Sequence, residues 1–484
     1  MPPAPPALLS SRTAVLLTAL YAAWAALLLT NFDLHPFASE KLGRVFTDVA
    51  RHLLHWDFTV DPDVITFEAF VHDGRTYTYF GILPAIARIP LVLLGGEDLQ
   101  LARISCLLAL AFGVYRGIRI VKAAFTLADN RAHPFVLPIL IGMATSGPAV
   151  YLLAAASIYQ EVIFWAAAFT AAFNAIVLRR HFAGQKLQGR DFVCLSVLAG
   201  LCLLTRSNCG VALYAALFLL MLADLRASPT PLISGTRVVA GAVTIGFVAM
   251  QLTVNWQRWG SPLAFLPWQY YDQFINHPDF MARLIRHGTF AAIRVPFAFA
   301  YYVTGLKPEA VAPAFFEDYY GAIEGPRSIT TLCAPLIWLF AAYGLVVLVR
   351  RSRRSGTPAL LLIGNGIAPL LMLGIPFLAV RYSFDGWGTL LIAAALGMRA
   401  IARQFPQPTR LIRSGLAGVL LLGILASHLS LLRYKINYSG TDPAIRYALS
   451  ARLQPLVCPA MPLSPDVKLT DFNPLVTPTC PPLW

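Results

Sequence analysis

The chain has 484 residues, of which 57% are hydrophobic and only 13% are charged, and its mean hydropathy is +0.63. Soluble domains carry about 25% charged residues, so this composition excludes an ordinary soluble enzyme. The net charge of +14 would suit a nucleic-acid-binding protein, but such proteins gather Lys and Arg on one polar face. Here the basic residues stand in short groups at the ends of apolar runs, as in membrane proteins, and nucleic acid is not an expected partner.

The apolar runs predict an all-α integral membrane protein with about eleven transmembrane helices, since a spanning helix needs about 20 apolar residues. In chain order the runs are Thr13–Thr30, Leu101–Val121, His133–Leu153, Ile158–Leu178, Phe192–Leu204, Cys209–Leu225, Val238–Val254, Cys333–Val349, Ala359–Val380, Gly388–Ile401 and Leu416–Leu432.

Basic residues follow every second run and set the expected orientation, because Lys and Arg are enriched in cytoplasmic loops. The amino terminus with Arg12 is therefore expected in the cytoplasm and the tail outside. A cleavable signal peptide is the alternative for the first run, but Pro2–Pro6 is not a basic leader. The basic groups are Arg116, Arg119, Lys122 and Arg131; Arg179, Arg180, Lys186 and Arg190; Arg226 and Arg237; Arg350, Arg351, Arg353 and Arg354; and Arg399, Arg403, Arg410 and Arg413.

Residues 31–96 form a long segment between the first two runs, which this orientation places on the outer face. A long loop in a membrane protein normally has a function, so we expect the chemistry here. Within it, Phe80–Gly95 is apolar but holds Pro84, Pro90 and a central Arg88. A charge at mid-bilayer costs about 2.5–3.5 kcal/mol, so we predict a juxtamembrane helix with Arg88 reaching lipid headgroups. The acidic residues of the segment are Asp33, Glu40, Asp48, Asp57, Asp61, Asp63, Glu68 and Asp73.

Two other long pieces are expected outside: a second outer segment, 255–331, and the tail, 433–484. The second segment is rich in aromatic residues, which predicts interfacial anchoring, with a sugar- or lipid-facing groove as the alternative. In the proline-rich tail, Cys458 and Cys480 lie where a disulfide is permitted, and whether they pair stays open. The other cysteines are expected to be small packing residues: Cys106, Cys194, Cys202, Cys209 and Cys333.

The sequence has no glycine-rich phosphate loop and no soluble-hydrolase motif. Instead, ionisable residues stand near the outer ends of the runs. A carboxylate can take a proton from an attacking hydroxyl, and arginines can hold a phosphate and stabilise its charge. The alternative for each residue is simple solvation or snorkelling, which we expect for Asp57, Asp61, Asp63 and Glu68. The candidates for chemistry are Asp33, Asp48, Glu161, Arg206 and Arg381.

Several stretches carry a family resemblance. They are HDGRTYTYFGILPAIARIPLVLLGG, LQLARISCLLALAFGVYRGIRI, SGPAVYLLAAASIYQEVIFW, AGLCLLTRSN, VNWQRWGSPLAF and VRYSFDGWG. Together they resemble the membrane-integral glycosyltransferases of the C superfamily, which include protein O-mannosyltransferases and lipid A aminoarabinose transferases. The first acid stands alone in NFDLHP, unlike the paired acids of the mannosyltransferases, and FGILP replaces the double proline of many relatives.

The resemblance implies residue roles. Asp33 or Asp48 would be the base that activates the acceptor, with Asp33 the better match by its distance from the first run. Glu161 would be the second acidic position. Phosphate and substrate would be bound by Arg75, Tyr79, Arg88, Tyr159, Arg206 and Arg381.

The resemblance also implies the reaction: transfer of a sugar from a polyprenyl-phosphate donor to a lipid, glycan or protein acceptor at the outer face of a bacterial inner membrane. One carboxylate base and a lipid phosphate leaving group favour inversion at the anomeric carbon. A divalent cation is an optional cofactor, because no ligand cluster is visible. The transferase-like part would be 1–432. The alternatives are a transporter or lipid flippase, for which no internal repeat is seen, and a non-catalytic scaffold.

Overall fold

The computed structural model describes residues 11–126, 133–227, 235–275, 278–306, 308–320, 322–324, 329–350 and 356–437. It confirms an all-α integral membrane protein, in which each predicted run is helical over most of its length. The helices long and apolar enough to cross a membrane are α1 (Ser11–Leu29), α6 (Ala102–Phe125), α9 (Ile158–Phe182), α11 (Ser207–Ala227), α12 (Gly235–Trp259), α20 (Gly356–Leu373) and α22 (Arg410–Asn437). The remaining runs form α7 (Val136–Thr145) with α8 (Pro148–Leu152), α10 (Gly189–Leu203), α19 (Pro335–Arg350) and α21 (Trp387–Gln404).

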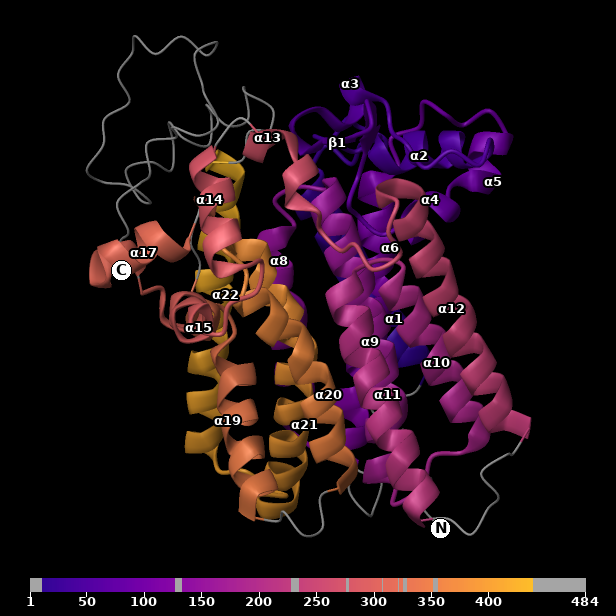
Figure 1. Cartoon of the computed structure of the whole chain (residues 1–484). Helices are drawn as coiled ribbons and strands as arrows, with labels where there is room; N and C mark the ends of the chain where they lie inside the picture. The colour runs from indigo at the N-terminus through magenta and orange to yellow at the C-terminus, as the bar shows by residue number, and fades with distance from the viewer. Residues whose placement is uncertain are drawn as a thin grey trace, which may run out of the picture.

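The long helices pack in neighbouring pairs: α6 on α9, α10 on α12, α11 on α20, and α19 on α21 (Figure 1). The α19–α21 pair depends on glycine. A Cβ atom on Gly344 of α19 would collide with the carbonyl oxygen of Ala393, and one on Gly397 of α21 would collide with that of Phe340. Small residues let two helix backbones approach closely where lipid gives no hydrophobic driving force for association.

Two predicted runs differ from the helices observed. The run His133–Leu153 is divided into α7 and α8, because Gly147 has a φ of 91° and Pro148 begins a new helix. The run ending at Val380 stops as a helix at Leu373, just before Gly374 and Pro376. The chain continues as strand β4 (Phe377–Ala379) and the 3₁₀ helix η4 (Val380–Gly386). This early stop is important, because η4 carries Arg381.

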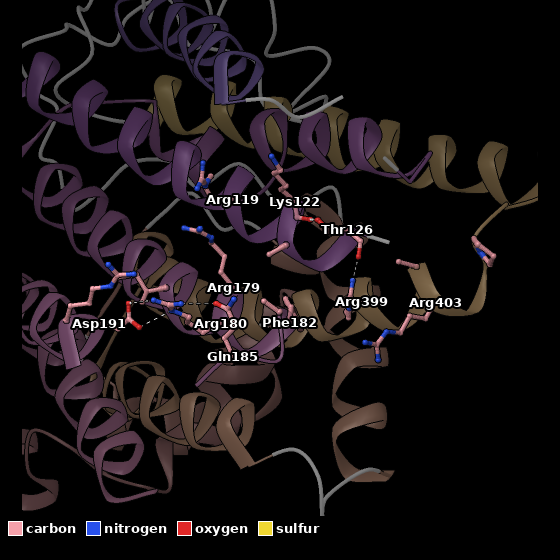
Figure 2. A pocket seen from close by; sticks show the side chains of 16 residues that line it. Arg119, Lys122, Thr126, Arg179, Arg180, Phe182, Gln185, Asp191, Arg399 and Arg403 are labelled. Atoms are coloured by element: carbon pink, nitrogen blue, oxygen red, sulfur yellow. Dashed lines mark hydrogen bonds and ion pairs between the residues drawn. The ribbon is translucent and has the colours of Figure 1, made fainter. Parts of the chain in front are cut away.

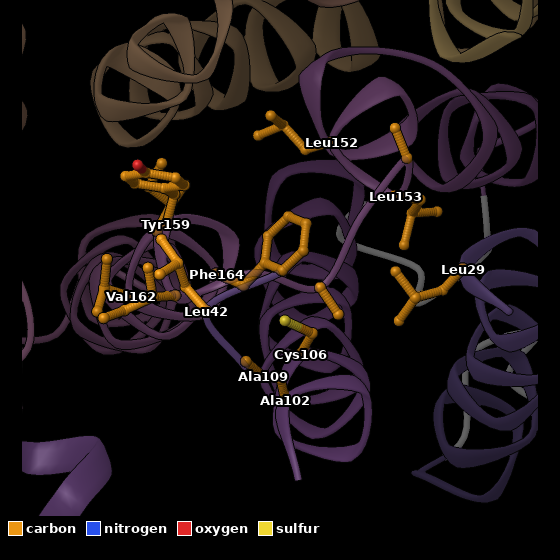
Figure 3. Packing of buried hydrophobic residues seen from close by; sticks show 14 of the residues in the cluster. Leu29, Leu42, Ala102, Cys106, Ala109, Leu152, Leu153, Tyr159, Val162 and Phe164 are labelled. Carbon is orange, nitrogen blue, oxygen red and sulfur yellow. The ribbon is translucent and has the colours of Figure 1, made fainter. Parts of the chain in front are cut away.

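Residues 31–96 form a small folded layer at one end of the helix bundle (Figure 1). Its elements are α2 (Val45–Leu53), α3 (Pro62–Ile65), η1 (Thr66–Glu68), β1 (Phe70–His72), β2 (Arg75–Tyr77), α4 (Leu83–Ile86) and α5 (Ile89–Leu93). The two short helices α4 and α5 confirm that Phe80–Gly95 does not span. The layer is joined to the bundle by apolar packing, in which Leu42 lies with Leu29, Cys106 and Phe164 (Figure 3).

We call residues 31–96 the first outer segment and keep the name second outer segment for 255–331, after the sequence prediction. The two segments pack against each other. Phe70 of β1 stacks on Tyr271, with ring centroids 4.8 Å apart, and pairs with it through an isolated antiparallel bridge. Trp259 and Phe274 complete the same buried aromatic cluster, whereas Trp256 is exposed as an interfacial anchor would be. The elements are η2 (Trp268–Tyr270), α13 (Asp272–Ile275), α14 (Pro278–His287), α15 (Arg294–Thr304), α16 (Pro308–Val311), α17 (Pro313–Tyr319), β3 (Ala322–Glu324), which pairs in parallel with β4, and α18 (Thr330–Cys333).

Four of the cysteines expected to pack are buried, and Cys194 of α10 is exposed instead. Cys194 lies on a helix face that the protein does not cover, where an apolar side chain is compatible with lipid. Cys458, Cys480 and the tail beyond residue 437 lie outside the described residues.

Candidate active site

Glu68 is the centre of a buried polar cluster between the two outer segments and α9. Its residue is only 6% exposed. Its Oε1 atom accepts hydrogen bonds from the Tyr159 hydroxyl and, at 3.1 Å, from the Tyr271 hydroxyl. The prediction that Glu68 serves solvation is therefore wrong. Its partners are 91 and 203 residues away along the chain, so nothing local in the sequence distinguishes Glu68 from the solvated acids around it.

Arg381 brings a cation to the same place. Its guanidinium carbon lies 4.2 Å from the centroid of the Tyr159 ring and 5.1 Å from that of Tyr382. Tyr79 lies half-buried beside these groups. Burial raises the pKa of its hydroxyl well above the ordinary value, Glu68 and Tyr382 add to this, and the Arg381 cation opposes it. We call Glu68, Tyr79, Tyr159, Tyr271 and Arg381 the Glu68 cluster.

Arg206 stabilises the segment that carries Arg381. It lies between α10 and α11, and its Nε and Nη2 atoms donate to the two carboxylate oxygens of Asp385, at 2.5 and 2.6 Å. Asp385 is at the end of η4, four residues after Arg381. A paired guanidinium–carboxylate contact of this kind fixes orientation as well as charge. Arg206 therefore ties η4 to the start of α11.

Gly81 lets the first outer segment pack closely against the connection between α10 and α11. A Cβ atom there would collide with the carbonyl oxygens of Leu204 and Thr205, immediately before Arg206. The Leu83 backbone N–H donates to the Leu204 carbonyl at 2.9 Å. The glycine in the YFG stretch is thus required for close backbone contact.

Glu161, expected as a second acidic site residue, is fully buried in an ion pair with Arg88. Arg88 Nη2 donates to Oε2 at 2.9 Å, and Arg88 Nη1 lies 2.8 Å from Oε1. The Ser105 hydroxyl also donates to Oε1, at 2.6 Å. Arg88 does not reach headgroups: the prediction was wrong because a buried carboxylate on α9 attracts its charge. The pair fastens the α4–α5 region to α9 and α6.

Asp48 is buried on α2 and belongs to a network with Arg51, His52 and Asp61. Arg51 Nη2 donates to Asp48 Oδ1 at 2.7 Å and to Asp61 Oδ2 at 2.5 Å. The backbone N–H of Asp61 donates to Asp48 Oδ2 at 2.8 Å, and His52 Nε2 lies 3.2 Å from Asp61 Oδ1. Asp61 is thus not merely solvated. The network connects α2 to Asp61, the residue just before α3.

Asp33 lies at the surface, with 51% of its side chain exposed. Its Oδ1 accepts the His35 backbone N–H at 2.8 Å and lies 3.7 Å from Arg103 Nη1. Arg103 makes its close ion pair with Glu40 instead, at 2.7 Å. Burial raises the pKa of Glu40, and Arg103 opposes the rise. Arg75 is exposed on the β1–β2 hairpin.

Asp48, His52 and Asp61 offer one ligand atom each within 4.8 Å of one another, a grouping that the sequence did not reveal. The Arg51 guanidinium contacts one oxygen of each carboxylate, so a divalent cation at this group would compete with Arg51. A cation would have to displace a charge-assisted pair that balances the same groups.

Arg51→Ala should turn this group into a cation site. We expect millimolar Mn²⁺ to raise the thermal unfolding midpoint of the purified variant and to leave that of the wild type unchanged, because only the variant has free carboxylates beside an imidazole. Arg44→Ala, which removes an exposed partner of Asp98, is the matched control. An equal response of wild type and variant would show that Arg51 does not guard the group.

The structure brings together Tyr79, Tyr159 and Arg381 from the expected site and places Arg206 behind them, while Asp33, Asp48, Glu161, Arg75 and Arg88 lie in other contacts. Sequence reasoning missed Glu68, Tyr271 and Asp385. One signal for Asp385 was present: it stands four residues after Arg381 in VRYSFDGWG, a spacing that places both on neighbouring turns.

Comparison with known proteins finds no matching family model and no matching curated protein. Two solved structures are similar in architecture. One is the oligosaccharyltransferase of Archaeoglobus fulgidus in complex with zinc and sulfate, with a TM-score of 0.49, 15% identity, and coverage of 90% of this chain and 55% of that one. The other is the archaeal oligosaccharyltransferase AglB from Archaeoglobus fulgidus with an inhibitory peptide and a dolichol-phosphate, with a TM-score of 0.42, 15% identity, and coverage of 94% and 58%. The chain thus spans little more than half the length of each.

Proposed function

We propose that the protein is a membrane glycosyltransferase that moves a sugar from a polyprenyl-phosphate donor to a lipid, glycan or protein acceptor at the outer face of the membrane. One observation carries the proposal: a buried carboxylate, Glu68, and a guanidinium, Arg381, both contact Tyr159 at the junction of the outer segments and the helix bundle. A base and a phosphate-binding cation are the two groups that this reaction needs. The sequence resemblance to the C superfamily supports the same reaction.

In the proposed reaction Glu68 accepts the proton of the acceptor hydroxyl. The acceptor oxygen forms a bond to the anomeric carbon of the sugar as the bond from that carbon to the phosphate oxygen breaks. The electron pair of the broken bond leaves with the polyprenyl phosphate, whose charge Arg381 stabilises. Attack opposite the leaving group inverts the anomeric configuration.

The tyrosine hydroxyls position Glu68 for this role. The Tyr159 and Tyr271 hydroxyls both donate to Oε1, which fixes the orientation of the Glu68 carboxylate. An acceptor hydroxyl can replace one of the two donors without leaving the carboxylate unsatisfied. Tyr79 belongs to the same cluster and supplies a polar edge for the sugar.

Other expected residues take supporting roles in the proposal. Glu161 has a structural role, because its oxygens already accept from Arg88 and Ser105. Asp48 is held by Arg51 and the Asp61 N–H. Arg206 acts through Asp385 to position η4 and hence Arg381. Asp33 is exposed at the surface, where it can contact an acceptor.

Arg381→Gln tests the donor class. In the reconstituted protein we expect transfer of labelled sugar from a polyprenyl-phosphate donor to fall at least tenfold in kcat/KM, because a charge-assisted contact to the leaving phosphate is lost. Arg44→Gln, which changes an exposed cation in residues 31–96, should retain wild-type transfer.

Two results would oppose the proposal. If Arg381→Gln transferred sugar as well as the Arg44→Gln control, Arg381 would not bind the donor phosphate. If the wild type moved the labelled donor across vesicle membranes without forming a glycosylated product, the protein would be a transporter.

A further inference from the structure

A large basic cavity lies at the end of the bundle opposite the Glu68 cluster. Helix α9 begins beside Glu68 at Tyr159 and reaches the cavity about 20 residues later, which is about 30 Å along a helix. The cavity has a volume of about 980 Å³. Its cationic lining comes from the ends of α6, α9 and α21 and the start of α10: Arg119, Lys122, Arg179, Arg180, Arg190, Arg399 and Arg403.

The positive charge of this cavity is poorly balanced. The lining contains one carboxylate, Asp191, and it already accepts from Arg180 Nε at 3.0 Å and Nη2 at 3.2 Å. Within the described ranges, neither Arg119, Arg179 nor Arg403 has a carboxylate within 4.0 Å. The Nε atom of Arg399 is buried there without an acceptor.

The arrangement exceeds what membrane orientation requires. Cytoplasmic loops are basic in most membrane proteins, but those charges are usually spread over solvated loops. Here Arg119 of α6, Arg179 and Arg180 of α9, and Arg399 of α21 surround one space, as Figure 2 shows. Phe182 and other apolar residues form part of the wall, which reduces the solvent screening of the like charges.

We propose that this cavity binds a ligand with two or more phosphate groups. Arginine forks match phosphate oxygens in paired hydrogen bonds, and basic pockets between membrane helices bind phosphate-bearing headgroups. The ligand would be either an anionic lipid headgroup or a soluble polyphosphate, since both present the same chemistry. The site is separate from the proposed transfer reaction and does not depend on it.

The test uses the full chain in neutral detergent with two probes, inorganic pyrophosphate and cardiolipin, and phosphatidylcholine as the zwitterionic reference with a single phosphate. We expect at least one probe to bind the wild type, with an affinity that falls as salt increases. The double variant R179Q/R403Q should bind at least tenfold more weakly. The matched control R350Q/R410Q removes two exposed arginines at the same end but outside the cavity and should bind as the wild type does.

A measurement on the unmodified protein makes the test independent of variant folding. Lys122 lines the cavity and Lys186 does not, so a bound probe should slow acetylation of Lys122 relative to Lys186, read by mass spectrometry. Binding of cardiolipin alone would identify a lipid site, and binding of pyrophosphate alone a soluble-ligand site. Equal affinity of the two double variants, or absence of Lys122 protection by both probes, would overturn the proposal.

Discussion

Glu68→Gln is expected to lower sugar transfer by about 10²–10⁴-fold, the usual contribution of a general base. The amide cannot take the acceptor proton, but its oxygen can still accept the hydroxyls of Tyr159 and Tyr271, which bind Oε1 in the wild type. The loss should therefore appear in kcat while the protein remains folded. The measurement is transfer of labelled sugar by equal amounts of reconstituted protein.

Asp73→Asn is the matched control for Glu68→Gln. Asp73 lies in the same outer segment, and its side chain is 86% exposed, so its loss should leave transfer unchanged. A thermal unfolding midpoint close to that of the wild type would show that Glu68→Gln is folded. If that folded variant still transferred sugar at the wild-type rate, Glu68 would not be the base, and Asp48→Asn would become the next variant to measure.

Glu161→Leu should destabilise the protein by about 3–5 kcal/mol, the usual cost of removing one member of a buried ion pair. Arg88 is itself buried, so the substitution leaves its guanidinium without a counter-charge. The unfolding midpoint in detergent, by heat or by denaturant, measures the effect. The Arg88→Met variant should lose a similar amount, since it leaves the Glu161 carboxylate unpaired.

The double variant R88M/E161L provides the control, because apolar replacement of both partners often restores stability. We expect it to recover most of the loss and to retain sugar transfer. A stable but inactive double variant would contradict the structural role and return Glu161 to the reaction. Losses that simply add in the double variant would show that the two residues are not coupled.

These two predictions distinguish a catalytic role for Glu68 from a structural role for Glu161, although both are acidic residues that look alike in the sequence. Glu68 and Glu161 are both buried acids near the start of α9, but their contacts differ: Glu68 Oε1 accepts from the hydroxyls of Tyr159 and Tyr271. Glu161 has the guanidinium of Arg88. In the proposal, this two-point contact with Arg88 gives Glu161 a structural role.

Length and patterning by themselves determined the membrane class, the order of the helices and the non-spanning character of Phe80–Gly95, because a helix crossing lipid must be apolar over a fixed length. Tertiary structure decided the site. Glu68 gained its partners from α9 and the second outer segment, Arg381 was placed by an early helix stop before Pro376, and Arg88 was drawn inward by Glu161. These placements depend on contacts between residues far apart in the chain. The local sequence around each acidic residue of the loop does not indicate which of them will be buried.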